Sequence, residues 1–426
     1  MLQFITPDQA RAIVLEQVAP LPPETIPHAE ALGRVLAREI VSPVALPPFD
    51  NSAMDGYALC ADDLQNAGKN APARLRVLET IAAGDVPQQS VESGSCAKIM
   101  TGALLPKGAD AVVMREETDD GAEDVEIFRS ARRGQNIRRA GEEIARGETI
   151  FESGTLVRPA EWGLLASLEQ AQIEVFRRPR VALIVTGEEL VELGAPLQDG
   201  QIRDSNSYTL KGLALSCGAQ ISETKRVGDD VEAMKEALHK CAANCDAIIT
   251  SGGVSAGDFD PVRDVLHEIA EIHFWKVKTK PGGPIMFATL RAEQEYCCTE
   301  QDSPMEQYSV PVFGLPGNPV SVMVSWEQYV RPALLKMSGR KNMRRIELPV
   351  VMDEAMRSPL GKVEFARVFV RREKDVWRAS GTGAPSSGRL SSMACANALL
   401  VIPAETTQVE AGSTLIAQMT EWPEME

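Results

Sequence analysis

The sequence has no long apolar run and no visible export signal. No stretch approaches the roughly 20 apolar residues that are needed to cross a bilayer, and the N-terminal residues contain no basic region followed by an apolar core. We therefore expect a cytoplasmic protein without a membrane partner.

An excess of basic residues is also absent. The chain has 44 Lys and Arg against 60 Asp and Glu, which gives a formal net charge of −16. Binding to nucleic acid is driven largely by the release of counterions when Lys and Arg meet phosphate, so we expect no nucleic-acid partner. An anionic small-molecule substrate would need local Lys or Arg, or a metal cation, to overcome the acidic background.

The cysteines do not form the compact framework of a small secreted domain. Their scatter predicts mostly reduced thiols, several of them buried, at Cys60, Cys96, Cys217, Cys241, Cys245, Cys297, Cys298 and Cys395. Cys241 and Cys245 follow His239 closely and could suggest zinc. These three residues fall within an amphipathic helical pattern, however, and no fourth ligand lies nearby, which favours a core role.

What the sequence does have is the composition of an ordinary globular protein, with 44% hydrophobic and 24% charged residues. A length of 426 residues corresponds to about three domains at ~100–200 residues each. Changes of hydrophobic periodicity predict an α/β multidomain protein. We divide it into a discontinuous, helical N-terminal domain (1–50 and 137–178), an inserted all-β domain (51–136), a central α/β domain with a mostly parallel sheet (179–340), and a small C-terminal β barrel (341–426).

The first two domains are predicted from a capping box and from short strands. Thr6 is expected to cap a helix that begins at Pro7, with Gln9 completing the box. The inserted domain alternates short strands with turn residues, and we expect strands at 74–81, 96–100, 111–117 and 125–129. Helical character returns at 159–171.

The α/β domain is predicted from apolar strands that alternate with amphipathic helices. Strands are expected at 181–185, 247–250, 274–278, 284–289 and 310–313. Helices are expected at 205–217, 231–243, 261–270 and 319–336. A polar, acidic stretch at 291–309 is interpreted as a hairpin insertion. Alternation with period two then predicts the barrel strands, at 346–352, 363–371, 398–403 and 414–419.

Three of the apolar strands lead directly into glycine-containing turns. These turns are TGEE (186–189), SGGVSAGDFD (251–260) and GLPGNPVS (314–321). In an open parallel sheet the carboxyl ends of the strands meet at one edge, so we expect the three loops to converge on a single crevice. Glycines and helix N-termini in such a crevice suit a nucleotide or a phosphorylated ligand. Asp260 and Asn318 could equally be ordinary N-caps, each followed by proline.

Charged residues flank these loops. The acids are Glu188, Glu189, Asp204, Asp229, Asp230, Asp258 and Asp260. Clustered carboxylates would repel phosphate unless Mg²⁺ lies between them. Lys276, Lys278 and Lys280 alternate along the sequence WKVKTKPGG, which is also the pattern of a solvated strand face. We favour a functional role for Lys280, whose turn falls at a strand end, and leave the other two lysines open.

A second candidate region lies upstream. The segment PPFDNSAMDGYAL (47–59) carries Asp50 and Asp55 where the chain enters the β domain. Residues 100–103 and 138–144 have a similar turn-rich character. Composition alone does not decide whether these segments form an interdomain hinge or contact a ligand.

Seven blocks of this sequence resemble, in the same order, those of the molybdopterin molybdenumtransferase family (the MoeA proteins, similar to the E domain of gephyrin). The blocks are DNSAMDGYA, IMTGALLPKGADAVV, IRRAGEEI, VTGEEL with GQIRDSN, ITSGGVSAGDFD, KPGGPIMF and GLPGNPVS. The resemblance implies a molybdopterin-binding-like central domain, an N-terminal linking and dimerisation domain, and a homodimer. It also implies transient contact with other proteins of cofactor assembly. The implied reaction inserts molybdenum from molybdate into adenylylated molybdopterin, with release of AMP and assistance from Mg²⁺.

Carried over block by block, the resemblance also implies the site residues. The catalytic set is Asp55, Thr101, Glu188, Asp229 or Asp230, Asp260, Lys276 and Lys280. Glu188 and Asp260 would hold the metal. Ligand-binding positions would be Ser251, Gly252, Gly253, Ser255, Gly257, Asp258, Pro281, Gly282, Gly314, Pro316, Gly317 and Asn318. The site resembles a cleft between the α/β domain of one subunit and the N-terminal loops of the other.

Two other functions fit parts of the sequence. A nucleotide pyrophosphatase on the same α/β module would explain SGGVSAGD but not the upstream blocks. A non-catalytic scaffold that binds the cofactor would explain the fold, but the carboxylates of the blocks are intact, which argues against a site that has lost its activity.

Overall fold

The computed structural model describes residues 1–228, 230–254, 260–293, 307–383 and 386–422 of the chain. It divides into two compact units. The first unit comprises Met1–Ala37, Gly154–Arg158 and Gln172–Glu426, and the second comprises Arg38–Ser153 and Pro159–Ala171. Among the described residues, no helix combines the length and apolar character that a membrane span requires.

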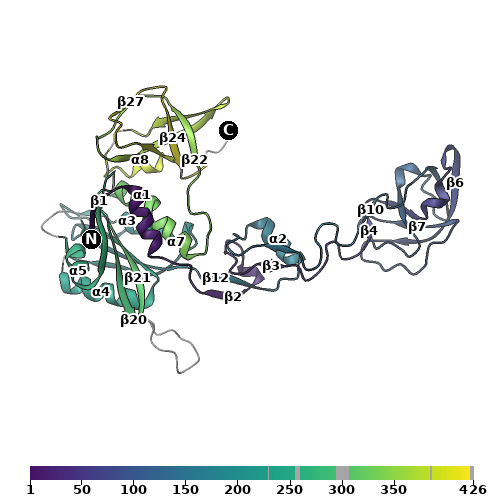
Figure 1. Ribbon diagram of the computed structural model, residues 1–426, viewed down its shortest axis with the longest axis horizontal. Helices are drawn as coiled ribbons and strands as arrows, with labels where there is room; N and C mark the ends of the chain where they lie inside the picture. The colour runs from purple at the N-terminus through teal and green to yellow at the C-terminus, as the bar shows by residue number, and fades with distance from the viewer. Residues whose placement is uncertain (229, 255–259, 294–306, 384–385, 423–426) are drawn as a thin grey trace. The chain divides into compact units, whose positions relative to one another are not determined.

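The first unit is built on a seven-stranded sheet (Figure 1). The strands, in spatial order, are β1 (Leu2–Ile5), β18 (Glu271–Val277), β20 (Met286–Glu293), β21 (Gln307–Leu315), β17 (Ala247–Ser251), β13 (Arg180–Thr186) and β16 (Gln220–Val227). Only β20 runs antiparallel to its neighbours. The predicted, mostly parallel sheet is confirmed.

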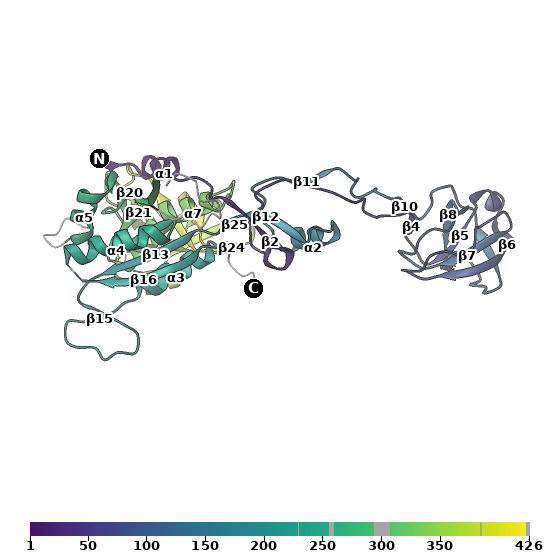
Figure 2. The same ribbon diagram turned by 90° about the horizontal axis from the view of Figure 1, so that it is seen from below.

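Helices cover both faces of this sheet (Figure 2). One face packs against α1 (Pro7–Glu16), α3 (Asn206–Ser216), α6 (Pro319–Ser325), a π-helical turn (Trp326–Val330) and α7 (Arg331–Met337). The other face packs against α4 (Val231–Asn244) and α5 (Pro261–Ile269). Alternate residues of β13 point to opposite faces, with Leu183 in the first core and Ile184 in the second. This two-sided burial explains why the central strands are continuously apolar.

The predicted helices and strands of the α/β region are present, but two strands of the seven-stranded sheet, β1 and β16, were not predicted. β1 pairs in parallel with β18, and α1 packs on the same sheet through Ala10 and Val14. β16 lies at the opposite edge and has exposed residues at alternate positions, so its apolar content is low. Edge strands are short or half-exposed and therefore carry a weak apolar signal. The predicted insertion is flanked by β20 and β21, which pair as far as Glu293 and Gln307, and residues 294–306 lie outside the described residues.

A closed barrel of five strands follows. Its strands are β22 (Glu347–Met352), β24 (Val363–Glu373), β25 (Val376–Gly381), β26 (Ala398–Ile402) and β28 (Thr414–Met419). The barrel closes because β24 pairs with both β25 and β26. The predicted C-terminal barrel is confirmed. A short strand, β19 (Thr279–Lys280), pairs in parallel with β24 and so joins the barrel to the loop that follows β18.

Smaller elements complete the first unit. They are β2 (Pro23–Pro27) paired with β12 (Gln172–Phe176), β14 (Leu190–Val191) paired with β15 (Ile202–Arg203), β23 (Met356–Arg357) paired with β27 (Gln408–Val409), a 3₁₀ turn at His28–Glu30, and α8 (Ser391–Ala394).

The second unit contains a five-stranded sheet in the order β8-β5-β7-β6-β9. The bounds are β5 (Gly56–Leu59), β6 (Gly68–Ile81), β7 (Ser95–Ile99), β8 (Ala111–Met114) and β9 (Asp124–Arg129). The unit also holds α2 (Pro159–Ser167), the strand pairs β3 (Ile40–Val41) with β11 (Thr149–Phe151) and β4 (Asn51–Ser52) with β10 (Ile137–Arg138), and 3₁₀ turns at Ala61–Leu64 and Arg115–Glu117. The four predicted strands of this sheet are present. In the described segments 1–50 and 137–178 the α-helices are α1 and α2, and the rest forms short strands, turns and irregular structure.

Candidate functional site

The three glycine-containing loops leave one edge of the sheet of the first unit. β13, β17 and β21 are adjacent and parallel, and Ser251 pairs in register with Val185 on one side and with Leu315 on the other. The loops that follow these strands therefore begin side by side. The predicted convergence is confirmed for the described parts of the three loops.

Gly252 allows the loops to approach this closely. Its backbone has a positive φ of 93°, and its N–H donates to the carbonyl oxygen of Leu315 at 3.0 Å. There is also no room for a side chain, because a Cβ atom at this position would lie 2.6 Å from Oγ1 of Thr186. Only glycine fits this conformation and this space.

Thr186 is thus the closest neighbour of Gly252. A Cβ atom built on Gly252 would lie 2.6 Å from Oγ1 of Thr186 and 3.0 Å from its carbonyl oxygen, both well inside van der Waals contact. Gly317 of the third loop also comes close, because a Cβ atom there would lie 3.8 Å from Cα of Gly252. The three loops therefore meet at Gly252.

Asn206, the first residue of α3, cross-links two of the loops. Its Nδ2 donates to Oγ of Ser251 at 2.9 Å and to the carbonyl oxygen of Gly317 at 2.7 Å. The side chain is buried, and among the described residues its Oδ1 has no hydrogen-bond partner. An unsatisfied buried acceptor costs about 1–3 kcal/mol, so Oδ1 is suited to accept a hydrogen bond from a ligand. Asn206 lies within the block GQIRDSN, but the sequence pattern predicts no role for it.

Asp260 is a buried carboxylate at this edge, with 6% of its surface exposed. It occupies the N-cap position of α5 and lies 3.7 Å from Nη1 of Arg263. Within the described part of the chain its side chain makes no capping hydrogen bond to the helix. The N-cap position foreseen in the sequence is confirmed, but capping does not account for the buried carboxylate.

The other predicted acids differ in their surroundings. Glu188 and Glu189 are exposed. Asp204 is buried, accepts a hydrogen bond from the N–H of Ser207 at 3.0 Å, and lies 3.7 Å from Nη2 of Arg226. Asp230 caps α4 by accepting from the N–H of Ala233 at 2.7 Å, which gives it a structural role in addition to the catalytic one predicted.

Four predicted positions lie outside the described residues. They are Asp229, Ser255, Gly257 and Asp258.

The described residues contain no cluster of three or more His, Cys, Asp or Glu side chains that could hold a metal ion. Mg²⁺ usually needs only one or two protein carboxylates and completes its shell with water and substrate phosphate. Glu188 and Asp260 supply carboxylate oxygens that follow β13 and precede α5 at the same sheet edge, so their donor chemistry fits this ion.

Lys280 is the last residue of β19, and its side chain contacts the barrel. Its Nζ lies 3.1 Å from Oε1 of Glu364 on β24, whose side chain is buried. Among the described residues, Oε2 of Glu364 has no hydrogen-bond partner. Nearby on β24, Arg367 is also buried and donates to Oγ of Ser392 at 3.3 Å. Glu364 and Arg367 were not predicted as site residues, because the period-two pattern of their strand indicates only a barrel strand.

The remaining lysines of WKVKTKPGG have different environments. Nζ of Lys276 lies 3.9 Å from the ring centroid of Trp275 and 5.6 Å from that of Phe4. These cation–π contacts give Lys276 a protein partner. Lys278 is exposed.

Close packing also explains why other positions of the predicted site are glycine. A Cβ atom on Gly253 would lie 2.9 Å from Cγ2 of Val262, and one on Gly314 would lie 2.7 Å from Cγ1 of Val254. A Cβ atom on Gly282 would lie 2.6 Å from Oγ of Ser325, so the turn that contains Pro281 and Gly282 packs against α6. Pro316 is buried, and Asn318 is the exposed N-cap residue of α6.

In the second unit the structure brings Asp55 and Thr101 together. The backbone N–H and the hydroxyl of Thr101 donate to Oδ1 of Asp55 at 2.7 and 2.8 Å. The backbone hydrogen bond, followed by the hydroxyl, holds the pKa of Asp55 below its ordinary value. Two of the residues predicted from separate sequence blocks are therefore direct partners.

The three upstream segments form one hydrogen-bonded cluster. Asp50 accepts from the N–H of Ala140 at 2.8 Å and from Nη1 of Arg139 at 2.6 Å, and the backbone bond is the first cause that lowers its pKa. The N–H of Gly102 donates to the carbonyl oxygen of Ser52 at 2.8 Å, and β4 pairs with β10. Residues 47–59, 100–103 and 138–144 thus lie together.

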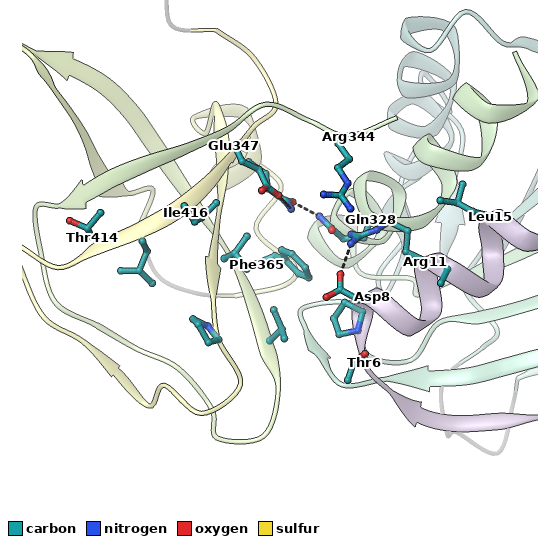
Figure 3. A pocket seen from close by; sticks show the side chains of 17 residues that line it. Thr6, Asp8, Arg11, Leu15, Gln328, Arg344, Glu347, Phe365, Thr414 and Ile416 are labelled. Carbon is teal, nitrogen blue, oxygen red and sulfur yellow. Dashed lines mark hydrogen bonds and ion pairs between the residues drawn. The ribbon is translucent and has the colours of Figure 1, made fainter. Parts of the chain in front are cut away.

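A cavity of about 990 Å³ contains none of the predicted site residues (Figure 3). It lies between α1 and the barrel. Its polar groups pair with one another: Arg11 binds Asp8, and Nε2 of Gln328 donates to Oε1 of Gln418 at 2.8 Å. The sheet-edge loops, in contrast, combine unsatisfied acceptors with charges of both signs.

Comparison with known proteins defines the class of this chain. Residues 5–168 match the model of the MoeA N-terminal region (domain I and II), residues 182–336 match that of a probable molybdopterin binding domain, and residues 349–416 match that of the MoeA C-terminal region (domain IV). The sheet-edge loops therefore lie within the region that matches a probable molybdopterin binding domain.

Individual relatives agree with this class. The chain is 38% identical over 409 residues to molybdopterin molybdenumtransferase 2 of Mycobacterium tuberculosis, covering 95% of this chain and 96% of the relative. It is 35% identical over 419 residues to molybdopterin molybdenumtransferase of Haemophilus influenzae, covering 97% and 98%. The crystal structure of a molybdopterin biosynthesis moeA protein from Pyrococcus horikoshii OT3 matches with a TM-score of 0.81 and 29% identity, covering 98% of this chain and 100% of that one. The chain belongs to the molybdopterin molybdenumtransferase (MoeA) family.

Proposed function

We propose that this protein transfers molybdenum from molybdate to adenylylated molybdopterin and releases AMP. Its role as a transferase in molybdenum cofactor biosynthesis follows from its family. The finer reaction is inferred from the site and from the sequence blocks that carry the family resemblance.

The observation that carries this proposal is the meeting of the three loops at the carboxyl edge of the sheet. Their backbones approach one another at Gly252, and Asn206 holds two of them in place while keeping an unsatisfied oxygen. Loops of this kind at strand ends bind ligands in open α/β sheets. A pyrophosphate that links molybdopterin to adenylate would be bound by backbone N–H groups at this edge.

Charged side chains would stabilise the leaving adenylate. Lys280 is partly exposed and sits at the end of β19, where its ammonium group would neutralise negative charge on a phosphate oxygen. Mg²⁺, when bound, would be held by Glu188 and Asp260 and would supply further positive charge to the phosphates. Oδ1 of Asn206 would accept a hydrogen bond from the ligand and fix its position.

We further propose a homodimer in which Asp55 and Thr101 of one subunit complete the site of the other. Mixed dimers test this arrangement. D55N and D260N subunits that are inactive alone should regain about a quarter of the normal activity when they are mixed and allowed to exchange, since one of the two sites then carries both intact residues in half of the molecules. Mixtures that stay inactive after exchange would show that Asp55 and Asp260 serve the same subunit.

The reaction itself is tested by following AMP. Purified protein is incubated with adenylylated molybdopterin and Mg²⁺, with and without molybdate, and AMP is measured by chromatography. We expect AMP release that depends on molybdate. AMP release that does not depend on molybdate would identify a nucleotide pyrophosphatase. Tight binding of adenylylated molybdopterin without AMP release would identify a scaffold.

A further inference from the structure

A second cavity, of about 330 Å³, is rich in arginine. Arg331, Arg340 and Arg345 line it together with Glu327 of the π-helical turn. Its wall also contains apolar side chains, among them Met323 and Leu335. None of these residues belongs to the sheet-edge site.

The positive charges in this cavity exceed the carboxylates that face them. Arg345 holds Glu327 with two hydrogen bonds of 2.9 Å, from Nε and Nη2. Nε of Arg331 is 3.8 Å from the same carboxylate, and its Nη1 donates to the carbonyl oxygen of Met343 at 3.0 Å. Among the described residues, the guanidinium of Arg340 has no hydrogen-bond or ion-pair partner. Glu421 is the other acid of the lining.

Burial makes this imbalance costly. The side chains of Arg331 and Arg345 are only 15% and 27% exposed. Burial lowers the pKa of both Arg331 and Arg340, and the charge of Arg345 lowers that of Arg331 further. A guanidinium does not lose its proton in a protein, and an uncompensated buried charge is unfavourable. An anion would remove this cost.

The planar fork of arginine matches phosphate oxygens in a bidentate geometry. We propose that this cavity binds a phosphate group carried by a small molecule, held by Arg340 and Arg331, with the non-polar part of that molecule against Met323 and Leu335. The site is separate from the proposed transferase site, and the two can fail independently.

Calorimetric titration of the full chain with inorganic phosphate, at an ionic strength fixed with sodium chloride, tests the proposal. R340Q should raise the dissociation constant of this site at least about tenfold, and R340K should give an intermediate value because it keeps the charge but loses the fork. R372Q is the matched control, since Arg372 is half-exposed and lies 3.6 Å from Asp375 outside the cavity. K280Q controls for phosphate bound at the sheet edge.

Thermal unfolding of R340Q separates binding from a structural role. Without phosphate, R340Q should unfold at the same or a higher temperature than the parent, because an unpaired, partly buried charge has been removed. AMP release by R340Q should stay normal. Equal phosphate affinity in R340Q and R372Q, or a loss of phosphate binding in K280Q alone, would overturn the proposal.

Discussion

The two clusters of predicted site residues differ in how their polar groups are satisfied. In the second unit, Asp50 and Asp55 each accept a backbone N–H from another loop, and these bonds lower the pKa of both carboxyls. In the first unit, Oδ1 of Asn206 at the sheet edge and Oε2 of Glu364 on β24 are buried without partners among the described residues. One cluster is satisfied by the protein, and the other keeps acceptors without partners.

This difference indicates that the two clusters have different roles. Carboxylates that bind backbone N–H groups hold loops in position and are already committed to the protein. Buried acceptors without partners cost free energy unless a ligand, water or ion satisfies them. We therefore expect changes at the sheet edge to affect turnover strongly, and changes in the second cluster to act first on loop order and on carboxylate ionisation.

The sharpest test of the sheet edge is D260N. We expect AMP release to fall by at least about 100-fold, because removal of a charged group that acts on the transition state has effects of this size. Circular dichroism and thermal unfolding should show a folded protein.

D264N is the matched control for D260N. Asp264 lies in the same helix and binds the same arginine, Arg263, at 3.0 Å, but it is exposed. D264N should keep its activity within about twofold, as is usual for an exposed ion pair. If D260N instead unfolds easily and shows normal turnover per folded molecule, Asp260 acts only at the helix terminus.

The second test concerns the close contact of the three loops. G252A should lower the free energy of unfolding by about 1–3 kcal/mol, because the residue has a positive φ and the new methyl group would meet Thr186. Urea unfolding measures the change.

G212A should change the free energy of unfolding in the opposite direction. Gly212 lies within α3 and a Cβ atom there would meet nothing within 4 Å, so alanine should stabilise the chain by about 0.5–1 kcal/mol. Equal stability of G252A and the parent protein would mean that the loops can separate without cost.

Much of the sheet edge could be predicted from the sequence. Apolar strands followed by glycine turns predicted that three loops would meet, since parallel strands end at one edge. Thr6 and Gln9 predicted the start of α1, and both hydrogen bonds of the capping box are present.

Other features depend on contacts that a sequence pattern does not contain. The unsatisfied oxygen of Asn206 follows from where Ser251 and Gly317 lie, 45 and 111 residues away in the chain. The approach of Glu364 to Lys280 depends on the pairing of β19 with the barrel. The resemblance implied Lys276 as a site residue while the residue pattern left it open, and neither its contact with Trp275 nor its backbone φ of +67° follows from periodicity.

The third test breaks the ion pair that joins the sheet edge to the barrel. K280M leaves Glu364 buried without its cation and should lower the free energy of unfolding by about 1–2 kcal/mol, less than for a fully buried pair because Lys280 is 39% exposed. K280M/E364Q should recover most of this stability, because the buried charge is removed as well. Urea unfolding of both variants decides the matter. A double variant that is no more stable than K280M would show that the pair contributes nothing through its charge.

The smallest expected effect lies in the second cluster. T101V removes the hydroxyl bond to Asp55 but keeps the backbone N–H bond, which is the larger cause of the lowered pKa. The pKa of Asp55 should therefore rise only part of the way to its ordinary value. Because the folded-state pKa is lowered, ionised Asp55 stabilises the fold above its unfolded-state pKa of about 3.9, and this contribution is lost as the pH falls through the folded-state pKa.

In T101V that loss should be complete at a higher pH and be smaller in total. NMR titration of the Asp55 carboxyl carbon measures the shift directly, and urea unfolding on both sides of it measures the linked stability. T118V is the control, since the hydroxyl of Thr118 donates to the carbonyl oxygen of Arg115 rather than to Asp55. An Asp55 pKa that is equal in T101V and T118V would show that the hydroxyl does not bind the carboxylate in solution, and the second cluster would then be held by its backbone bonds alone.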